Sequence, residues 1–107
     1  MKKIELVINE ETMETKTYLQ KPFIKGSIIR EGMRLGKEID STETLEEDII
    51  DKLASFIADR LYNGQFTADQ LIDGTDAREL IPMLLKQLET VFGSQGHDQV
   101  PLVEKMN

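Results

Sequence analysis

The sequence predicts an α+β fold that is mainly helical, in which an N-terminal β-hairpin packs on a bundle of about three to four helices. Residues 4–20 alternate between two sets of side chains, which is typical of strands. From residue 44 onward, apolar residues recur at helical spacing behind side chains that cap helix N-termini. The 107 residues, 39% of them hydrophobic, can form one modest core. We therefore expect one domain over residues 1–93 and a flexible C-terminal tail over residues 94–107.

The hairpin is predicted from two alternating segments joined by a polar loop. Ile4, Leu6 and Ile8 recur at every second position and place one apolar row on one face of a strand. Residues 15–20 alternate in the same way, and residues 9–12 suit a hairpin loop. Because an isolated hairpin is only marginally stable in water, we expect its apolar face to pack on the helices.

The first expected helix follows the hairpin. Pro22 ends the second strand because it lacks the N–H that a strand ladder needs. Ser27 is the expected N-cap, and loosely helical apolar spacing follows it. Gly32 and Gly36 interrupt this pattern. They either leave a smooth strip where another backbone can approach, or mark an imperfect surface helix, which is the interpretation we favour.

The strongest helical pattern begins at a capping box, Thr44-Leu45-Glu46-Glu47. Apolar residues then recur at i, i+3 and i+4 over several turns: Ile49, Ile50, Leu53, Phe56, Ile57 and Leu61. Asn63 and Gly64 are expected to end this helix in a left-handed C-cap.

Two further helices are expected before residue 93. The segment Thr67-Ala68-Asp69-Gln70 is a second capping box, opening a short helix that stops at Asp73-Gly74. Thr75 or Asp76 can cap the last helix, which runs to Gly93. Pro82 suits only the start of a helix, so we expect this helix to begin at about Leu80 or to bend there.

The last helix carries more apolar residues than a single stripe needs. We expect Ile81, Leu84, Leu85 and Leu88 to fill the core, whereas Met83 and Val91 suit the core and the surface equally. Four residues are candidates for partner binding, because core packing does not obviously claim them: Met33, Leu35, Met83 and Val91. Methionine side chains suit adaptable binding surfaces.

Nothing in the sequence predicts catalysis, and we expect no enzyme, no cofactor and no metal site. The chain has no cysteine and one histidine, His97, so the common zinc constellations cannot form. Acidic residues crowd the start of the strongest helix, where they favour the helix dipole. No phosphate-binding loop, nucleophile motif or calcium loop is present.

The net charge of −7 opposes nucleic-acid binding. Residues 1–37 hold eight basic residues and five acidic ones, whereas the rest of the chain is strongly acidic. This asymmetry permits head-to-tail self-association, although an ordinary solvated surface explains it as well. No apolar run is long enough to span a membrane and no signal peptide is evident, so we expect a cytoplasmic protein.

The order of these elements resembles the tail assembly chaperones of long-tailed phages and prophages of Gram-positive bacteria. The resemblance covers residues 3–93 and rests on the hairpin, the Pro22-Phe23 entry, the Glu-rich helix and the run from Gly64 to Gly74 ahead of Leu80-Ile81-Pro82.

The resemblance implies a protein that binds the tape measure protein, a long helical apolar chain, and keeps it soluble during tail tube assembly. It also implies self-association and a longer form, made by translational frameshifting, that contacts the tail tube protein. The setting would be the bacterial host cytoplasm. The family offers no catalytic residues to carry over.

The alternative is a small acidic regulator of the antirepressor or nucleic-acid-mimic type that binds a protein partner. Acid-rich helices permit this function. A tape-measure-like reading frame downstream would favour the chaperone, whereas a repressor or toxin gene would favour the regulator.

Overall fold

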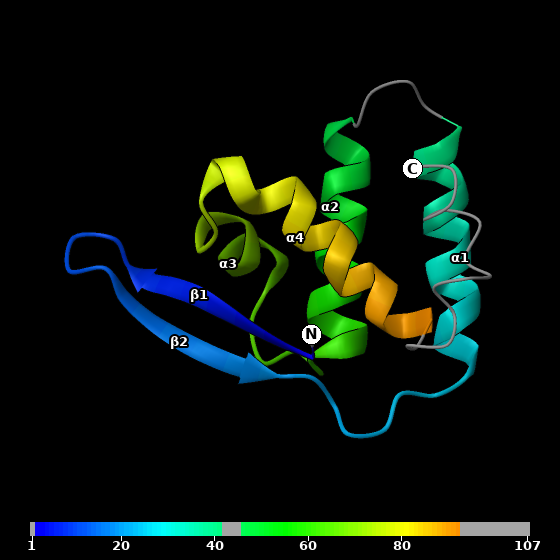
Figure 1. The fold of residues 1–107 in the computed structure, drawn as a ribbon, viewed down its shortest axis with the longest axis horizontal. Helices are drawn as coiled ribbons and strands as arrows, with labels where there is room; N and C mark the ends of the chain where they lie inside the picture. Colours follow the sequence, from blue (N-terminus) through cyan, green and yellow to red (C-terminus); the bar gives the residue numbers. More distant parts are fainter. Residues whose placement is uncertain (1, 42–45, 93–107) are drawn as a thin grey trace.

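The computed structural model describes residues 2–41 and 46–92, and within them it has the predicted α+β architecture (Figure 1). The strands β1 (Lys3–Asn9) and β2 (Glu14–Leu19) form an antiparallel sheet. Four α-helices follow: α1 (Ser27–Asp40), α2 (Glu47–Phe56), α3 (Ala68–Asp73) and α4 (Ala77–Glu89). A π-helix η1 (Ile57–Leu61) extends α2, and a 3-10 helix η2 (Thr90–Phe92) extends α4. The fold class is thus confirmed, while the predicted tail at residues 94–107 lies outside the described residues.

The hairpin places one face on the helices, but its apolar row is shorter than predicted. Ile4 and Leu6 are only 5% and 2% exposed. The strand register shifts between Val7 and Asn9, and Ile8 is 52% exposed. The prediction that Ile8 continues the buried row is wrong, because this irregularity breaks the period of two.

The hairpin loop is stabilised by the side chain of Asn9. The Asn9 side-chain oxygen accepts hydrogen bonds from the backbone N–H groups of Glu11, at 3.0 Å, and Thr12, at 3.3 Å. Met13 has a φ of 59°, which places it in the left-handed region. The predicted polar loop at residues 9–12 is therefore an ordered turn of the Asx type.

Helix α1 is continuous and begins one residue earlier than a Ser27 cap would allow. Gly26 is the N-cap with helical φ and ψ of −57° and −30°, and its carbonyl accepts from the Ile29 N–H at 3.0 Å. No side chain caps this end, so the prediction of Ser27 as N-cap is wrong. Gly32 and Gly36 are both buried. This burial is against an imperfect surface helix at the two glycines, but the neighbours of Gly32 are side-chain atoms of Phe56, Leu88 and Val91 and not another backbone.

Helix α2 begins at Glu47, with Glu46 as an extended N-cap that makes no side-chain capping bond. The prediction that the capping box Thr44-Leu45-Glu46-Glu47 opens this helix is therefore wrong, because Glu46 is extended and not helical. Thr44 itself lies outside the described residues. The other end is as expected, because Asn63 and Gly64 have φ values of 56° and 72°. The predicted apolar residues of this segment are buried, apart from the half-buried Ile50.

The capping box that opens α3 is confirmed. The Gln70 N–H donates to Thr67 Oγ1 at 3.1 Å, and the Thr67 N–H donates to Gln70 Oε1 at 2.9 Å. The helix ends at Gly74, whose carbonyl accepts from the Val7 N–H at 2.8 Å. This bond fastens the end of α3 to strand β1.

Helix α4 begins at Ala77, so a start at Leu80 is wrong. Asp76 Oδ1 accepts from the Arg78 N–H at 2.8 Å and caps the helix ahead of Pro82, which lies inside it. Leu84 and Leu88 are completely buried, as expected. Ile81 and Leu85, expected in the core, are only half-buried.

One hydrophobic cluster joins the hairpin to the helices. In Figure 1, α4 crosses α2, the hairpin runs beneath α3, and the hairpin loop and α1 lie at opposite ends of the longest axis. Most of the completely buried side chains come from α2, η1, α3 and α4. Helix α1 adds Ile28 and Leu35 to the core, and these are 9% and 7% exposed.

Candidate functional site

Polar groups inside the molecule form one network where the two strands meet α4. Gln87 Oε1 accepts from the Tyr62 hydroxyl at 2.7 Å and from Gln20 Nε2 at 3.1 Å. Gln87 Nε2 donates to the Lys3 carbonyl at 3.0 Å, and Gln20 Nε2 also donates to Thr90 Oγ1 at 2.8 Å. No buried side-chain nitrogen or oxygen of the described residues lacks a partner.

This network is structural in character. Burial raises the pKa of Tyr62 to about 12, and the hydrogen bonds to Gln20 and Gln87 lower it by less than burial raises it. A phenol with such a pKa stays protonated at neutral pH and therefore donates a hydrogen bond. Sequence analysis did not find Gln87, although its place on the apolar stripe beside Leu88 was a signal that it would be buried.

A pair of side chains with shifted pKa values, Asp76 and Arg78, lies at the start of α4. Hydrogen bonds from Arg78 hold the pKa of Asp76 at about 2. Arg78 Nη2 donates to Asp76 Oδ2 at 2.8 Å, and both side chains are solvent-accessible. These contacts belong to the helix cap.

Among the described residues, no group of three or more His, Cys, Asp or Glu side chains is arranged to hold a metal ion. His97 lies outside those residues. No helix within residues 2–41 and 46–92 is long and apolar enough to cross a membrane.

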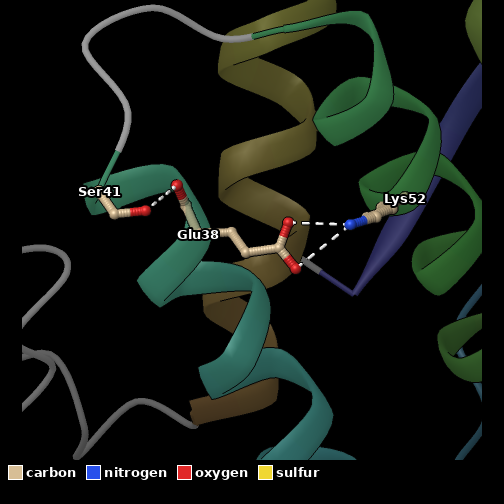
Figure 2. A network of polar contacts seen from close by, with 3 residues as sticks. All are labelled: Glu38, Ser41 and Lys52. Carbon is tan, nitrogen blue, oxygen red and sulfur yellow. Dashed lines mark hydrogen bonds and ion pairs between the residues drawn. The ribbon is translucent and has the colours of Figure 1, made fainter.

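A groove of about 510 Å³ runs between α1 and the α2–η1 helix. Leu35 and Phe56 line it, and two exposed ion pairs cross between its walls. Figure 2 shows one of them, in which Lys52 Nζ lies 3.0 Å from Glu38 Oε2. The other joins Arg60 Nε to Glu31 Oε1 at 3.1 Å.

A neighbouring groove of about 440 Å³ is lined by five cationic side chains and two acidic ones, Glu31 and Asp59. Its cationic side chains are Lys21, Lys25, Arg30, Arg34 and Arg60. Within the described part of the chain, Arg60 alone among these five makes an ion pair. This is the structural form of the basic N-terminal region that the charge distribution predicts.

Large apolar side chains are exposed at several places that sequence analysis did not single out. Besides Ile8 and Met33, they are Met13, Leu19, Phe23 and Ile29. Phe23 is the most exposed of them, at 76%. Ile29 and Met33 lie one turn apart on α1 and share one side of that helix.

The four predicted partner-binding residues are not equally accessible. Met33 is 48% exposed, whereas Leu35 is only 7% exposed and lies in the core. Met83 and Val91 are half-buried and pack against the core. The premise that core packing leaves all four free therefore fails for Leu35, because α1 turns that side chain inward. Their role in partner binding stays a prediction.

The four residues do not line one common groove. Met83 lines a groove of about 420 Å³ between β1 and α4, together with Val7 and Pro82. Leu35 lines the α1–α2 groove, and Val91 lies beneath Gly32 of α1.

Grooves between helices and exposed apolar side chains are features of a protein that binds other proteins. The chain matches the family model described as phage tail chaperone protein over residues 1–105, and it belongs to this family. The resemblance found in the sequence is thereby confirmed, and a role in phage tail assembly, with protein partners in that process, follows from the family. Comparison with curated proteins and with solved structures gave no match.

Proposed function

We propose that this protein binds the tape measure protein and keeps it soluble while the tail tube assembles around it, in the cytoplasm of the bacterial host. The family match over residues 1–105 carries the proposal. The exposed apolar side chains support it, because a helical apolar client needs apolar contacts. The action is binding alone, without catalysis, cofactor or nucleic acid.

Self-association is part of the proposal. The basic groove beside α1 is formed largely by residues 21–34, whereas most of the acidic residues of the chain lie in residues 38–107. Complementary charges in two regions favour head-to-tail contacts between copies. Light scattering at high protein concentration should show a mass that falls as salt is added, whereas a sharp monomer at low salt would contradict self-association.

A frameshifted longer form that contacts the tail tube protein is also proposed, from the family resemblance. Mass spectrometry of the proteins made during phage growth should detect peptides that continue beyond the normal end of this chain. Their consistent absence, while peptides of this chain are abundant, would remove the longer form from the proposal.

Co-expression with the tape measure protein of the same phage tests the main proposal. We expect the client to move from the insoluble fraction into a complex that co-purifies with this chain. Met33→Ser should lower the recovered client, because it removes an exposed apolar contact from α1. Lys37→Ser changes an exposed polar residue of the same helix and is the matched control. A client that stays insoluble beside a chain that purifies alone would contradict the proposal.

A further inference from the structure

Helix α1 covers apolar side chains of α2, α4 and η2. A Cβ atom built at Gly32 would lie 3.6 Å from Leu88 Cδ1, 3.6 Å from Phe56 Cζ and 3.7 Å from Val91 Cγ1. Phe56 lies on α2, Leu88 on α4 and Val91 on η2. Moving α1 away would therefore expose an apolar groove between α2 and the α4–η2 segment.

The glycine at position 32 is not required by the packing. Distances of 3.6–3.7 Å are ordinary van der Waals contacts, so an alanine would fit there. Gly74 is different, because a Cβ there would lie 2.8 Å from the Gln70 carbonyl oxygen and 3.0 Å from that of Val7. Gly32 thus weakens α1 relative to alanine without any steric need.

Two ion pairs join α1 to α2 and η1 within the described residues, and both are exposed. The side chains of the Glu38–Lys52 pair are 42% and 54% exposed, and those of the Glu31–Arg60 pair are 37% and 52% exposed. Exposed ion pairs contribute little to stability. Glu31 and Glu38 are seven residues apart and so lie on one side of α1.

We propose that α1 opens and that the groove beneath it binds an amphipathic helix of the client in place of α1. The groove defines the chemistry of that helix. A helix that binds there needs an apolar face with a small residue where Gly32 now lies. It also needs two acidic residues seven positions apart, which pair with Arg60 and Lys52. The identity of the client rests on the proposed function, whereas the opening and the groove do not.

A peptide with the sequence of residues 27–40, labelled and blocked at both ends, is a probe with this chemistry. The native chain has no cysteine, so Glu38→Cys with Lys52→Cys gives a unique pair for a short bis-maleimide linker between α1 and α2. We expect the linked protein to bind the peptide at least about tenfold more weakly than the same variant capped with a monofunctional maleimide, because linking lowers the open population.

Three controls accompany this comparison. The same linker on Glu5→Cys with Thr15→Cys, diagonal neighbours in the hairpin, should leave peptide binding unchanged. A peptide carrying Glu31→Lys and Glu38→Lys should bind about tenfold more weakly, because it brings cations to Arg60 and Lys52. In the full chain, Gly32→Ala should weaken peptide binding about fivefold by favouring the closed helix.

Equal binding of the peptide to linked and capped protein, or no binding to either, would overturn the inference. A chain that binds the peptide but not the tape measure protein would support the opening of α1 and contradict the proposed function. Tape measure binding that survives linking of α1 to α2 would leave the proposed function intact and overturn the helix-exchange inference.

Discussion

Helices α1 and α2 contact each other, but they are held in place by different interactions. Helix α2 and the π-helix that extends it bury Leu53, Ile57 and Leu61 completely. Helix α1 offers two buried aliphatic side chains, two buried glycines and two exposed ion pairs. This difference is the basis of our proposal that α1 opens at a lower cost in free energy than the rest of the molecule, which we call the body. The predictions below test this contrast, from the largest expected effect to the smallest.

The stability of the body should fall strongly when a substitution creates a cavity in it. Leu84→Ala deletes a completely buried side chain and should lower the free energy of unfolding by about 3 kcal/mol. Urea denaturation measures this loss. Leu19→Ala, at a side chain that is 64% exposed, is the control and should change stability by less than about 0.5 kcal/mol. Similar effects of the two substitutions would contradict the assignment of the body as the stable region.

The polar network should be the second most sensitive feature. Gln87→Leu removes the acceptor of the Tyr62 hydroxyl and the donor to the Lys3 carbonyl, so it should cost about 2 kcal/mol. Denaturation by urea at neutral pH measures the effect. Gln65→Leu removes an exposed glutamine that donates to the Leu19 carbonyl and should cost much less. Equal losses of stability in the two variants would show that burial does not increase the contribution of the network to stability.

The dependence of stability on alkaline pH tests the same network in the native protein, without a substitution. The pKa of Tyr62 is about 12 when folded, against 10.0 for the unperturbed group. The unfolded state therefore loses its proton first, and stability should fall as the pH rises from about 10 to about 12. Tyr62→Phe should remove this part of the pH dependence. A variant with the same alkaline loss as the native protein would show that another group causes it.

The α1 contacts should respond to a gain of helix stability. Gly32→Ala adds a methyl group in van der Waals contact with Phe56, Leu88 and Val91 and should stabilise α1 by about 1 kcal/mol. Amide hydrogen exchange in α1 should slow, while exchange in α2 should change less. Slower exchange throughout the molecule by the same factor would mean that α1 does not open separately.

The smallest effect is expected from the ion pairs. Lys52→Ala removes the contact with Glu38 and should change global stability by less than about 0.5 kcal/mol. Thermal unfolding measures this change, and Arg60→Ala should behave alike at its own contact with Glu31. A loss of several kcal/mol from either variant would contradict the interpretation of α1 as loosely held.

The elements that local sequence determines were the ones predicted best. The capping box at Thr67 and Gln70, the Asp76 cap and the left-handed Asn63-Gly64 end depend on neighbours within a few residues. The structure confirms these three signals, whereas the local cap predictions at Ser27 and at Thr44-Leu45-Glu46-Glu47 are wrong. The family was likewise found from the run around these caps.

Features that depend on distant contacts were predicted less well. Leu35 is buried because it lies on the side of α1 that carries Ile28 and Gly32, and the interrupted apolar pattern did not identify that side. Ile8 leaves the apolar row because the strand register shifts beside it. The partnership of Gln20 with Gln87 joins residues 67 positions apart, which spacing along the chain cannot reveal.

Native-state hydrogen exchange of the full chain tests the contrast between α1 and the body most directly. Amides of α1 between Arg30 and Lys37 should exchange through an opening that needs less free energy than global unfolding and exposes little surface. Amides of α2 near Leu53 and of α4 near Leu88 should exchange only through global unfolding. Exchange of all three helices through one global opening would contradict the separate opening of α1.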